Sequence, residues 1–170
     1  VVLDTAPTGH TIRLLELPEV IQQWLGEILS VLVHYEDVVS LPRVNEKLIS
    51  LSRGLKKLRA LLADQQASRL VAVTIPTHLA VAETERLMAG CQRLGVNFAG
   101  LIVNQVTPTG SDELSATINN REAIEVQRLV TAANGTPVAQ VQRTTPPRGI
   151  DALAALGDAL TANTTVRDAA

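Results

Sequence analysis

The chain has 170 residues, of which 46% are hydrophobic and only 2% aromatic, and its formal net charge at pH 7 is −2. This composition suits one globular domain with an aliphatic core, and no apolar run approaches the ~20 residues that cross a bilayer. It offers neither the positive charge nor the aromatic platforms used to bind nucleic acids, so we expect no nucleic-acid partner. The single cysteine cannot form a disulfide within these residues and favours a reducing, cytoplasmic location.

Short apolar runs alternate with helical patterns along the chain. The runs are bounded by turn residues and predict buried parallel strands at residues 1–4, 70–75, 98–103 and 137–141. The later helical patterns cover residues 78–94, 119–133 and 150–161, and the polar tail after Ala162 is expected to fray. This alternation predicts a doubly wound, mostly parallel α/β sheet, with residues 1–170 forming a single α/β domain.

Residues 18–68 carry two long helical patterns where a crossover needs only one helix. Their apolar residues recur in steps of four and three, the spacing at which two long helices pack together. The two stripes are Ile21, Leu25, Ile28, Leu32 and Tyr35, and Val44, Leu48, Leu51, Leu55, Leu58 and Leu62. We expect an inserted αα-hairpin that reverses at residues 37–43, closes on this seam and brings Trp24 to it as well.

Asp4 stands at the end of the first predicted strand, before a turn that contains Pro7 and Gly9. In open α/β sheets ligands bind at the carboxyl ends of strands. A carboxylate there can hold Mg²⁺, directly or through water, and the Gly9 backbone can approach a phosphate. An aspartate in this place also commonly caps the next helix, so the pattern alone leaves both interpretations open.

Asn104 lies just beyond the apolar run 98–103, at its carboxyl end. A side-chain amide offers a hydrogen-bond donor and an acceptor, which complement the edge of adenine. Asn104 therefore predicts a nucleotide-base contact. The alternative is a turn residue that precedes Pro108, Thr109 and Gly110.

Four segments together resemble the ArsA-type ATPase family, which includes arsenite-pump ATPases and ATPases that target tail-anchored membrane proteins. Residues 4–15, with Leu17 and Pro18 just beyond, resemble the switch II segment of that family. The resemblance continues in the same order at residues 83–87 and 102–106, with a weaker trace at 147–153. These segments span nearly the whole chain.

The resemblance assigns roles to three residues near the start of the chain. Asp4 is implied to orient the water shell of Mg²⁺, and Gly9 to present its N–H to the γ-phosphate of ATP. His10 matches a position that helps to bind the metalloid in the arsenite-pump branch. A lone histidine is also commonly a hydrogen-bonded structural group, so both interpretations of His10 stay open.

The resemblance also implies an adenine site in the second half of the chain. It implies that the Asn104 side chain hydrogen-bonds to adenine and that Gln105 lies beside it. Residues 144–148, which include Pro146 and Pro147, form a flap over the base.

Two family features are absent from these residues. No glycine is followed by lysine, so the phosphate-binding P-loop is missing. We interpret the chain as the C-terminal portion of a longer ATPase and expect it to be inactive alone. Ser115 and Ile118 stand where the targeting branch carries zinc-binding cysteines, so no zinc is expected. Cys91, on an apolar helical stripe, is interpreted as a core residue, which makes activation by arsenite doubtful.

The expected function is ATP binding and hydrolysis with Mg²⁺ in a homodimer, this chain supplying switch II and the adenine site. The alternative is a nucleotide-switched binding module that holds an apolar protein segment, such as a membrane-protein client, on the helical insertion. The hairpin contains no methionine, unlike the Met-rich groove of the targeting branch, which favours a closed hairpin. A partitioning ATPase of the ParA type is disfavoured, because the residues after Asp4 do not match its switch.

Overall fold

The computed structural model describes residues 1–5, 8–34, 42–110, 112–162 and 164–165. It divides into two compact units, one of residues 1–69 with 93–97, the other of residues 70–92 with 98–170. The second unit holds a sheet flanked by helices, and the first holds a helical hairpin. The expected α/β class is confirmed.

A mostly parallel sheet forms the centre of the second unit. Strands β1 (Leu70–Thr74), β2 (Phe98–Val106) and β3 (Val138–Gln142) are parallel neighbours in that order. The two-residue strand β4 (Thr164–Thr165) pairs antiparallel with β3, so this part of the tail is ordered, in contrast to the fraying expected there. Pairing with β3 explains the difference, because it satisfies backbone groups that a free tail would leave to water.

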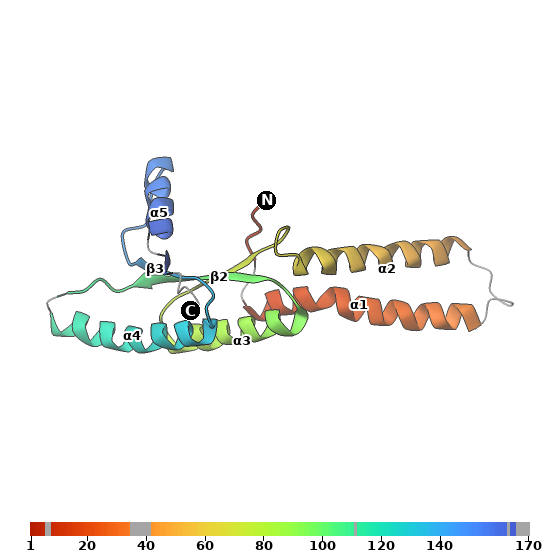
Figure 1. Cartoon of the computed structure of the whole chain (residues 1–170), viewed down its shortest axis with the longest axis horizontal. Coiled ribbons are helices and arrows are strands. Elements are labelled where there is room, and N and C mark those ends of the chain that lie inside the picture. Colours follow the sequence, from red (N-terminus) through yellow and green to blue (C-terminus); the bar gives the residue numbers. More distant parts are fainter. Residues whose placement is uncertain (6–7, 35–41, 111, 163, 166–170) are drawn as a thin grey trace. The chain divides into compact units, whose positions relative to one another are not determined.

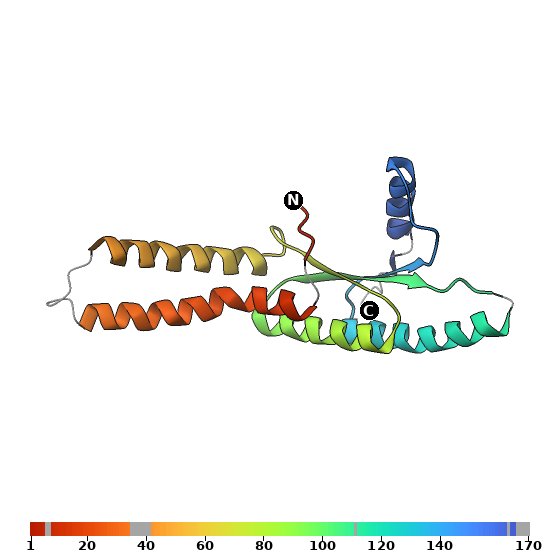
Figure 2. The same ribbon diagram turned by 180° about the vertical axis from the view of Figure 1, so that it is seen from behind.

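Helices cover the sheet unequally on its two faces (Figures 1 and 2). Helices α3 (His78–Leu94) and α4 (Glu113–Ala133) follow β1 and β2 and lie along one face. Helix α5 (Ile150–Ala162) contacts β3 from the other face. The fully buried side chains of the core come from β2, α3 and α4: Leu101, Val103, Val81, Cys91 and Leu129.

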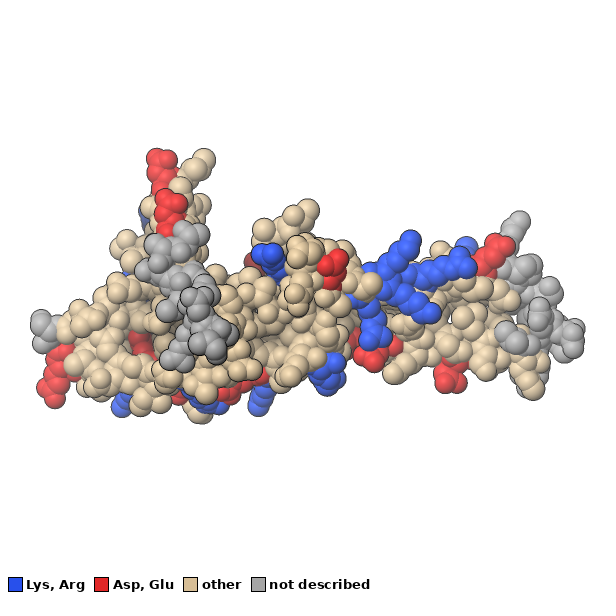
Figure 3. Space-filling model, in the orientation of Figure 1, with Lys and Arg blue, Asp and Glu red and all other residues tan. Residues whose placement is uncertain are grey.

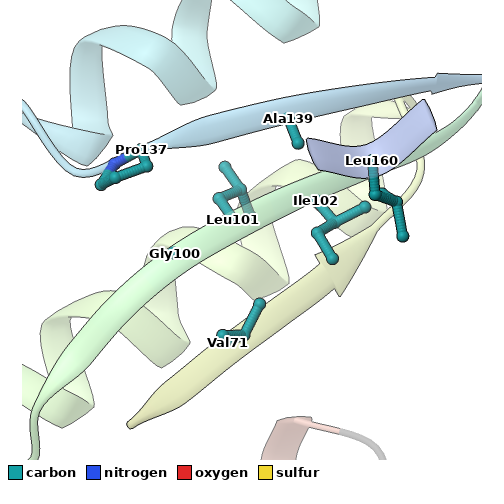
Figure 4. A pocket seen from close by; sticks show the side chains of 7 residues that line it. All are labelled: Val71, Gly100, Leu101, Ile102, Pro137, Ala139 and Leu160. Carbon is teal, nitrogen blue, oxygen red and sulfur yellow. The ribbon is translucent and has the colours of Figure 1, made fainter. Parts of the chain in front are cut away.

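The face that α5 approaches is only partly covered. Val73 of β1 keeps 65% of its surface exposed, although parallel strands normally bury both faces. Between α5 and the sheet lies a cavity of about 200 Å³ (Figure 4), lined by Val71, Gly100, Leu101, Ile102, Pro137, Ala139 and Leu160. No polar side chain lines this cavity, so it lacks the groups that would orient a nucleotide.

Two long helices, α1 (Thr8–His34) and α2 (Pro42–Ala63), pack against each other in the first unit. Leu25, Leu29 and Leu32 of α1 and Leu48, Leu55 and Leu62 of α2 are buried or half-buried at the spacing of a helical seam. Helices α1 and α2 therefore form an αα-hairpin. Tyr35 and most of the expected reversal, residues 37–41, lie outside the described residues.

The seam differs in detail from the expected one. Leu51 and Leu58 are exposed, and so are Ile21, Trp24 and Ile28, which were expected to face them. These residues form a second apolar stripe on each helix, beside the seam positions: Leu14, Leu17, Ile21, Trp24, Ile28 and Val31 on α1, and Val44, Leu51 and Leu58 on α2. Because the helices are antiparallel, both stripes fall on the same face of the hairpin, here called the apolar face.

Two expectations for the N-terminal residues are wrong. Residues 1–5 form no strand and their side chains are exposed; a strand requires a hydrogen-bonding neighbour, and they pair with none of strands β1 to β4. The helix begins at Thr8 and runs through Pro18, so Gly9 lies in a helical turn and the hairpin starts before residue 18. Pro18 costs one backbone hydrogen bond, but its ring is buried.

Positive charge gathers on α2 (Figure 3). All three lysines of the chain, Lys47, Lys56 and Lys57, lie on this helix. Helix α2 is therefore basic, although the net charge of the chain is small.

Helix α4 begins earlier than the expected residue 119 because Asp112 caps it. The Asp112 carboxylate accepts hydrogen bonds from the Ser115 hydroxyl and N–H, at 2.7 and 2.9 Å, and these bonds lower its pKa below the ordinary value. Because the ionised form makes the cap, its contribution to stability is lost as the pH falls through the pKa of the folded state.

Cys91 is a core residue, as expected. Its side chain is fully buried in α3, and burial raises the pKa of the thiol. A thiol held neutral in this way is a poor ligand for a soft metal or metalloid.

Candidate functional site

A β-bulge lies near the carboxyl end of β2, where Asn104 and Gln105 stand. Val103 pairs with Gln140 and Val106 with Gln142, so two residues of β2 oppose one residue of β3. Gln105 has a φ of 59°, a left-handed conformation that is uncommon for a residue other than glycine. The strand continues past the expected end at residue 103, and the bulge lies directly after it.

The Asn104 side chain is held by the backbone of the next residue. Its Oδ1 atom accepts a hydrogen bond from the Gln105 N–H at 2.9 Å. This bond fixes which end of the amide is the oxygen, since only the oxygen can accept from an N–H. No other hydrogen bond of the Asn104 side chain is present among the described residues, so the Nδ2 donor and the second lone pair of Oδ1 are available to a ligand.

The segment after the bulge is fastened to α4 by Glu122. The Glu122 carboxylate accepts hydrogen bonds from the Thr107 N–H (2.7 Å) and the Thr107 hydroxyl (2.8 Å). The side-chain amide of Asn119, one turn earlier on α4, donates to the Pro108 carbonyl at 3.3 Å. The loop that follows Asn104 is therefore tied to a helix of the same unit.

Pro146 and Pro147 lie in the exposed segment between β3 and α5. Since β2 and β3 are parallel neighbours, Asn104 and this segment lie toward the same end of the strands, their carboxyl end. The Arg143 N–H donates to the Val106 carbonyl at 2.7 Å and joins the two segments just after the bulge.

Asp4, Gly9 and His10 belong to the first unit. Asp4 lies in the exposed stretch before α1, and no hydrogen bond or ion pair of its carboxylate occurs among the described residues. Gly9 and the exposed His10 occupy the first turn of α1, where backbone N–H groups have no partner within the helix. Ala6 and Pro7, between Asp4 and the helix, lie outside the described residues.

Glu122 and Thr107 were not predicted from the sequence. A signal was available, because Glu122 falls between Ile118 and Leu129 on the inward stripe of α4, where a carboxylate is unexpected. Only 8% of its surface is exposed, which marks it as a residue that the fold needs.

Neither a metal centre nor a membrane span is evident in the described part of the chain. No cluster of three or more His, Cys, Asp or Glu side chains suited to a metal ion occurs among the described residues. Within the same ranges, none of the helices is long and apolar enough to cross a membrane.

Comparison with known proteins decides the family. The model of the anion-transporting ATPase family matches residues 1–145, most of the chain. The chain belongs to this family. Among its relatives is the ATPase GET3B of Arabidopsis thaliana, which is 37% identical over 124 residues, covering 66% of this chain and 30% of the relative.

Other members of the anion-transporting ATPase family are similar over more of the chain. The ATPase GET3C of Arabidopsis thaliana is 31% identical over 177 residues, covering 93% of this chain and 45% of that protein. The ATPase asna-1 of Caenorhabditis elegans is 30% identical over 141 residues, covering 76% of this chain and 41% of that protein. The chain thus spans less than half the length of these relatives.

Proposed function

We propose that this chain is the C-terminal portion of an ArsA-type ATPase that binds and hydrolyses ATP, and that it supplies switch II and the adenine site. The observation that carries the proposal is the bulge at Asn104. A conformation as uncommon as that of Gln105 costs free energy and persists only where the surrounding structure enforces it, and such residues cluster at functional sites. Family membership supports the reaction, since the relatives are named as ATPases.

The Watson–Crick edge of adenine presents an exocyclic amino donor and a ring-nitrogen acceptor. The Asn104 amide can complement both groups, with the free lone pair of Oδ1 and the Nδ2 donor. Guanine presents the reversed pattern, which would require the amide to flip and to give up its bond from the Gln105 N–H. Gln105, Pro146 and Pro147 are proposed to border the base.

Asp4 is the proposed contact to magnesium. Its carboxylate is a hard oxygen ligand, is exposed and has no protein partner among the described residues, which fits an ion that is usually held by one or two carboxylates and substrate phosphates. Mg²⁺ neutralises negative charge on the phosphates during phosphoryl transfer. Asp4 would orient its water shell, the Gly9 N–H would contact the γ-phosphate, and His10 would lie beside them.

The phosphate-binding loop and the group that polarises the attacking water are proposed to come from the part of the ATPase that these residues do not contain. Catalysis of phosphoryl transfer consists mainly of positioning and charge stabilisation, and both need that part. The segment alone is therefore expected not to turn over ATP. The proposed partner is a second copy in a homodimer, the proposed location is the cytoplasm, and neither zinc nor nucleic acid is expected to bind.

Asn104→Ala in the full-length ATPase is expected to weaken ATP binding by about 1–3 kcal/mol, the cost of leaving a recognition hydrogen bond unmade. The preference for ATP over GTP should fall at the same time, because the fixed amide distinguishes the two bases. Isothermal calorimetry with each nucleotide measures both effects. Unchanged affinity and unchanged preference would show that another residue reads the base.

A binding module is the second candidate function. The apolar face of the hairpin favours it, because it places a continuous stripe of α1 and three side chains of α2 in solvent on one side. Exposed apolar surface of this kind commonly binds an amphipathic or apolar helix. The proposed ligand is an apolar helical segment of a protein, with nucleotide controlling access to the face.

Ile28→Ser tests the binding module, since it places a hydroxyl within the apolar face. We expect retention of an apolar helical peptide on the chain to fall several-fold, at little cost in stability. Leu79→Ser is the matched control, because Leu79 is even more exposed but lies on α3. Equal retention by wild type and both variants would contradict a client site on the hairpin.

A further inference from the structure

Glu122 is a buried carboxylate that lacks a counter-ion. It retains 8% of its exposed surface, and no Lys, Arg or His pairs with it among the described residues. Burying a carboxylate is costly unless hydrogen bonds replace its hydration. Glu122 meets this cost with two bonds, both from Thr107. A glutamate on the inward stripe of α4 is thus explained by what it holds rather than by packing.

Glu122 holds the residue that follows the bulge of β2. Thr107 follows Asn104 by three residues and comes directly after Val106, where pairing with β3 resumes. Glu122 fixes Thr107 from α4, and the Arg143 N–H fixes Val106 from the β3 side. The two contacts secure the chain on the carboxyl side of Gln105, whose left-handed φ would otherwise relax.

We propose that Glu122 is a positioning residue for base recognition, acting through Thr107 and the bulge on the Asn104 amide. The inference rests on the proposed role of Asn104. With the bulge intact, the Gln105 N–H points at Asn104 Oδ1 and sets the orientation of the amide. Without the bonds between Glu122 and Thr107, the bulge relaxes, the amide rotates freely, and recognition of adenine over guanine declines.

The loop beyond Thr107 supports the same role. A Cβ atom on Gly110 would lie 2.7 Å from Ser115 Cβ, so the loop passes directly over the first turn of α4. With Asn119 bonded to the Pro108 carbonyl, α4 contacts the loop at three successive levels. Helix α4 therefore serves as the rigid support on which the base-reading residue is mounted.

Thr107→Val tests the proposal in the full-length ATPase, because it keeps the shape and the backbone bond but removes the hydroxyl donor. We expect the dissociation constant for ATP to rise about five- to tenfold, the effect of removing one hydrogen bond, with little change for GTP. Thr107→Ser, which keeps the hydroxyl, should restore the wild-type values. Thr117→Val is the matched control, since the exposed Thr117 hydroxyl bonds only to the Glu113 carbonyl within α4.

Measured for both nucleotides, the results separate the possibilities. A selective loss of affinity for ATP in Thr107→Val, with rescue by serine, supports positioning by Glu122. Equal losses for ATP and GTP would mean that Glu122 merely stabilises the fold, and would overturn the inference. Unchanged binding in Thr107→Val, while Asn104→Ala loses affinity and preference, would overturn it but leave the adenine site standing. If Asn104→Ala has no effect, the proposed site and this inference fail together.

Discussion

Asp4→Asn in the full-length ATPase is expected to lower ATP turnover by at least about 100-fold while changing nucleotide affinity by less than about threefold. The amide keeps the size of the side chain but removes the charge that is proposed to orient the water shell of Mg²⁺. Electrostatic groups of this kind act mainly on the transition state, and removing one typically costs about 10²–10³ in rate. Steady-state turnover at saturating Mg-ATP and calorimetric titration measure the two quantities.

Asp64→Asn is the control for this experiment. Asp64 is also exposed, and its carboxylate bonds to the Gln66 N–H in the turn that follows α2. Turnover should be unaffected by this change. A turnover of Asp4→Asn within twofold of wild type would remove Asp4 from the magnesium site and leave it as an ordinary residue before a helix.

Leu25→Ala is expected to destabilise the hairpin by about 2–5 kcal/mol. Leu25 is the most deeply buried apolar side chain of α1 among those that the structure describes, with 4% of its surface exposed, so its truncation leaves a cavity between two helices. The same truncation at the half-buried Leu55, on the facing helix, should cost less. Thermal and urea unfolding followed by circular dichroism provide the measurement.

Ile28→Ala provides the matched comparison, since Ile28 lies three residues after Leu25 on the same helix but keeps 45% of its surface exposed. We expect a loss of stability below about 1 kcal/mol, because a side chain already in water has little transfer free energy to lose. Comparable losses for the two variants would indicate that the apolar face is covered in solution and that the seam assigned here is wrong.

Much of the fold follows from local pattern. Strands β1 to β3 and helix α3 fall within a few residues of their predicted bounds, because short apolar runs and a long amphipathic helix carry strong periodic signals. The first predicted strand failed for a different reason. Residues 1–3 have the composition of a strand, but a strand is made by its neighbour, and the described sheet gives it none.

The hairpin shows a second limit of sequence patterns. Helix α1 carries apolar residues at both Leu25 and Trp24 and at both Leu32 and Val31, so two adjacent stripes share the four-three spacing. Periodicity predicts that one apolar stripe of α1 packs against another helix. Which of the two stripes does so depends on the partner helix. The prediction combined members of both, and only the contact with α2 distinguishes them.

The residues proposed for the base site stay a prediction, and the contacts around them were not foreseen from the sequence. Asn104 stood out because it follows a buried strand at its carboxyl end and its amide offers the donor and the acceptor that complement adenine. Its bulge and the bond from Gln105 could not be predicted, since both depend on the register between β2 and β3. Glu122 lies 18 residues further on, and sequence separation conceals a contact that the return of α4 along the sheet creates.

The position of Trp24 gives the hairpin its own optical signal. The chain contains a single tryptophan, Trp24, and this residue is 70% exposed on the apolar face of α1. Indole emission shifts to shorter wavelength when its surroundings lose water, and no second indole contributes a background from these residues. Fluorescence excited in the tryptophan band therefore reports on this one surface, and a ligand or second copy that covers it shifts the spectrum to the blue.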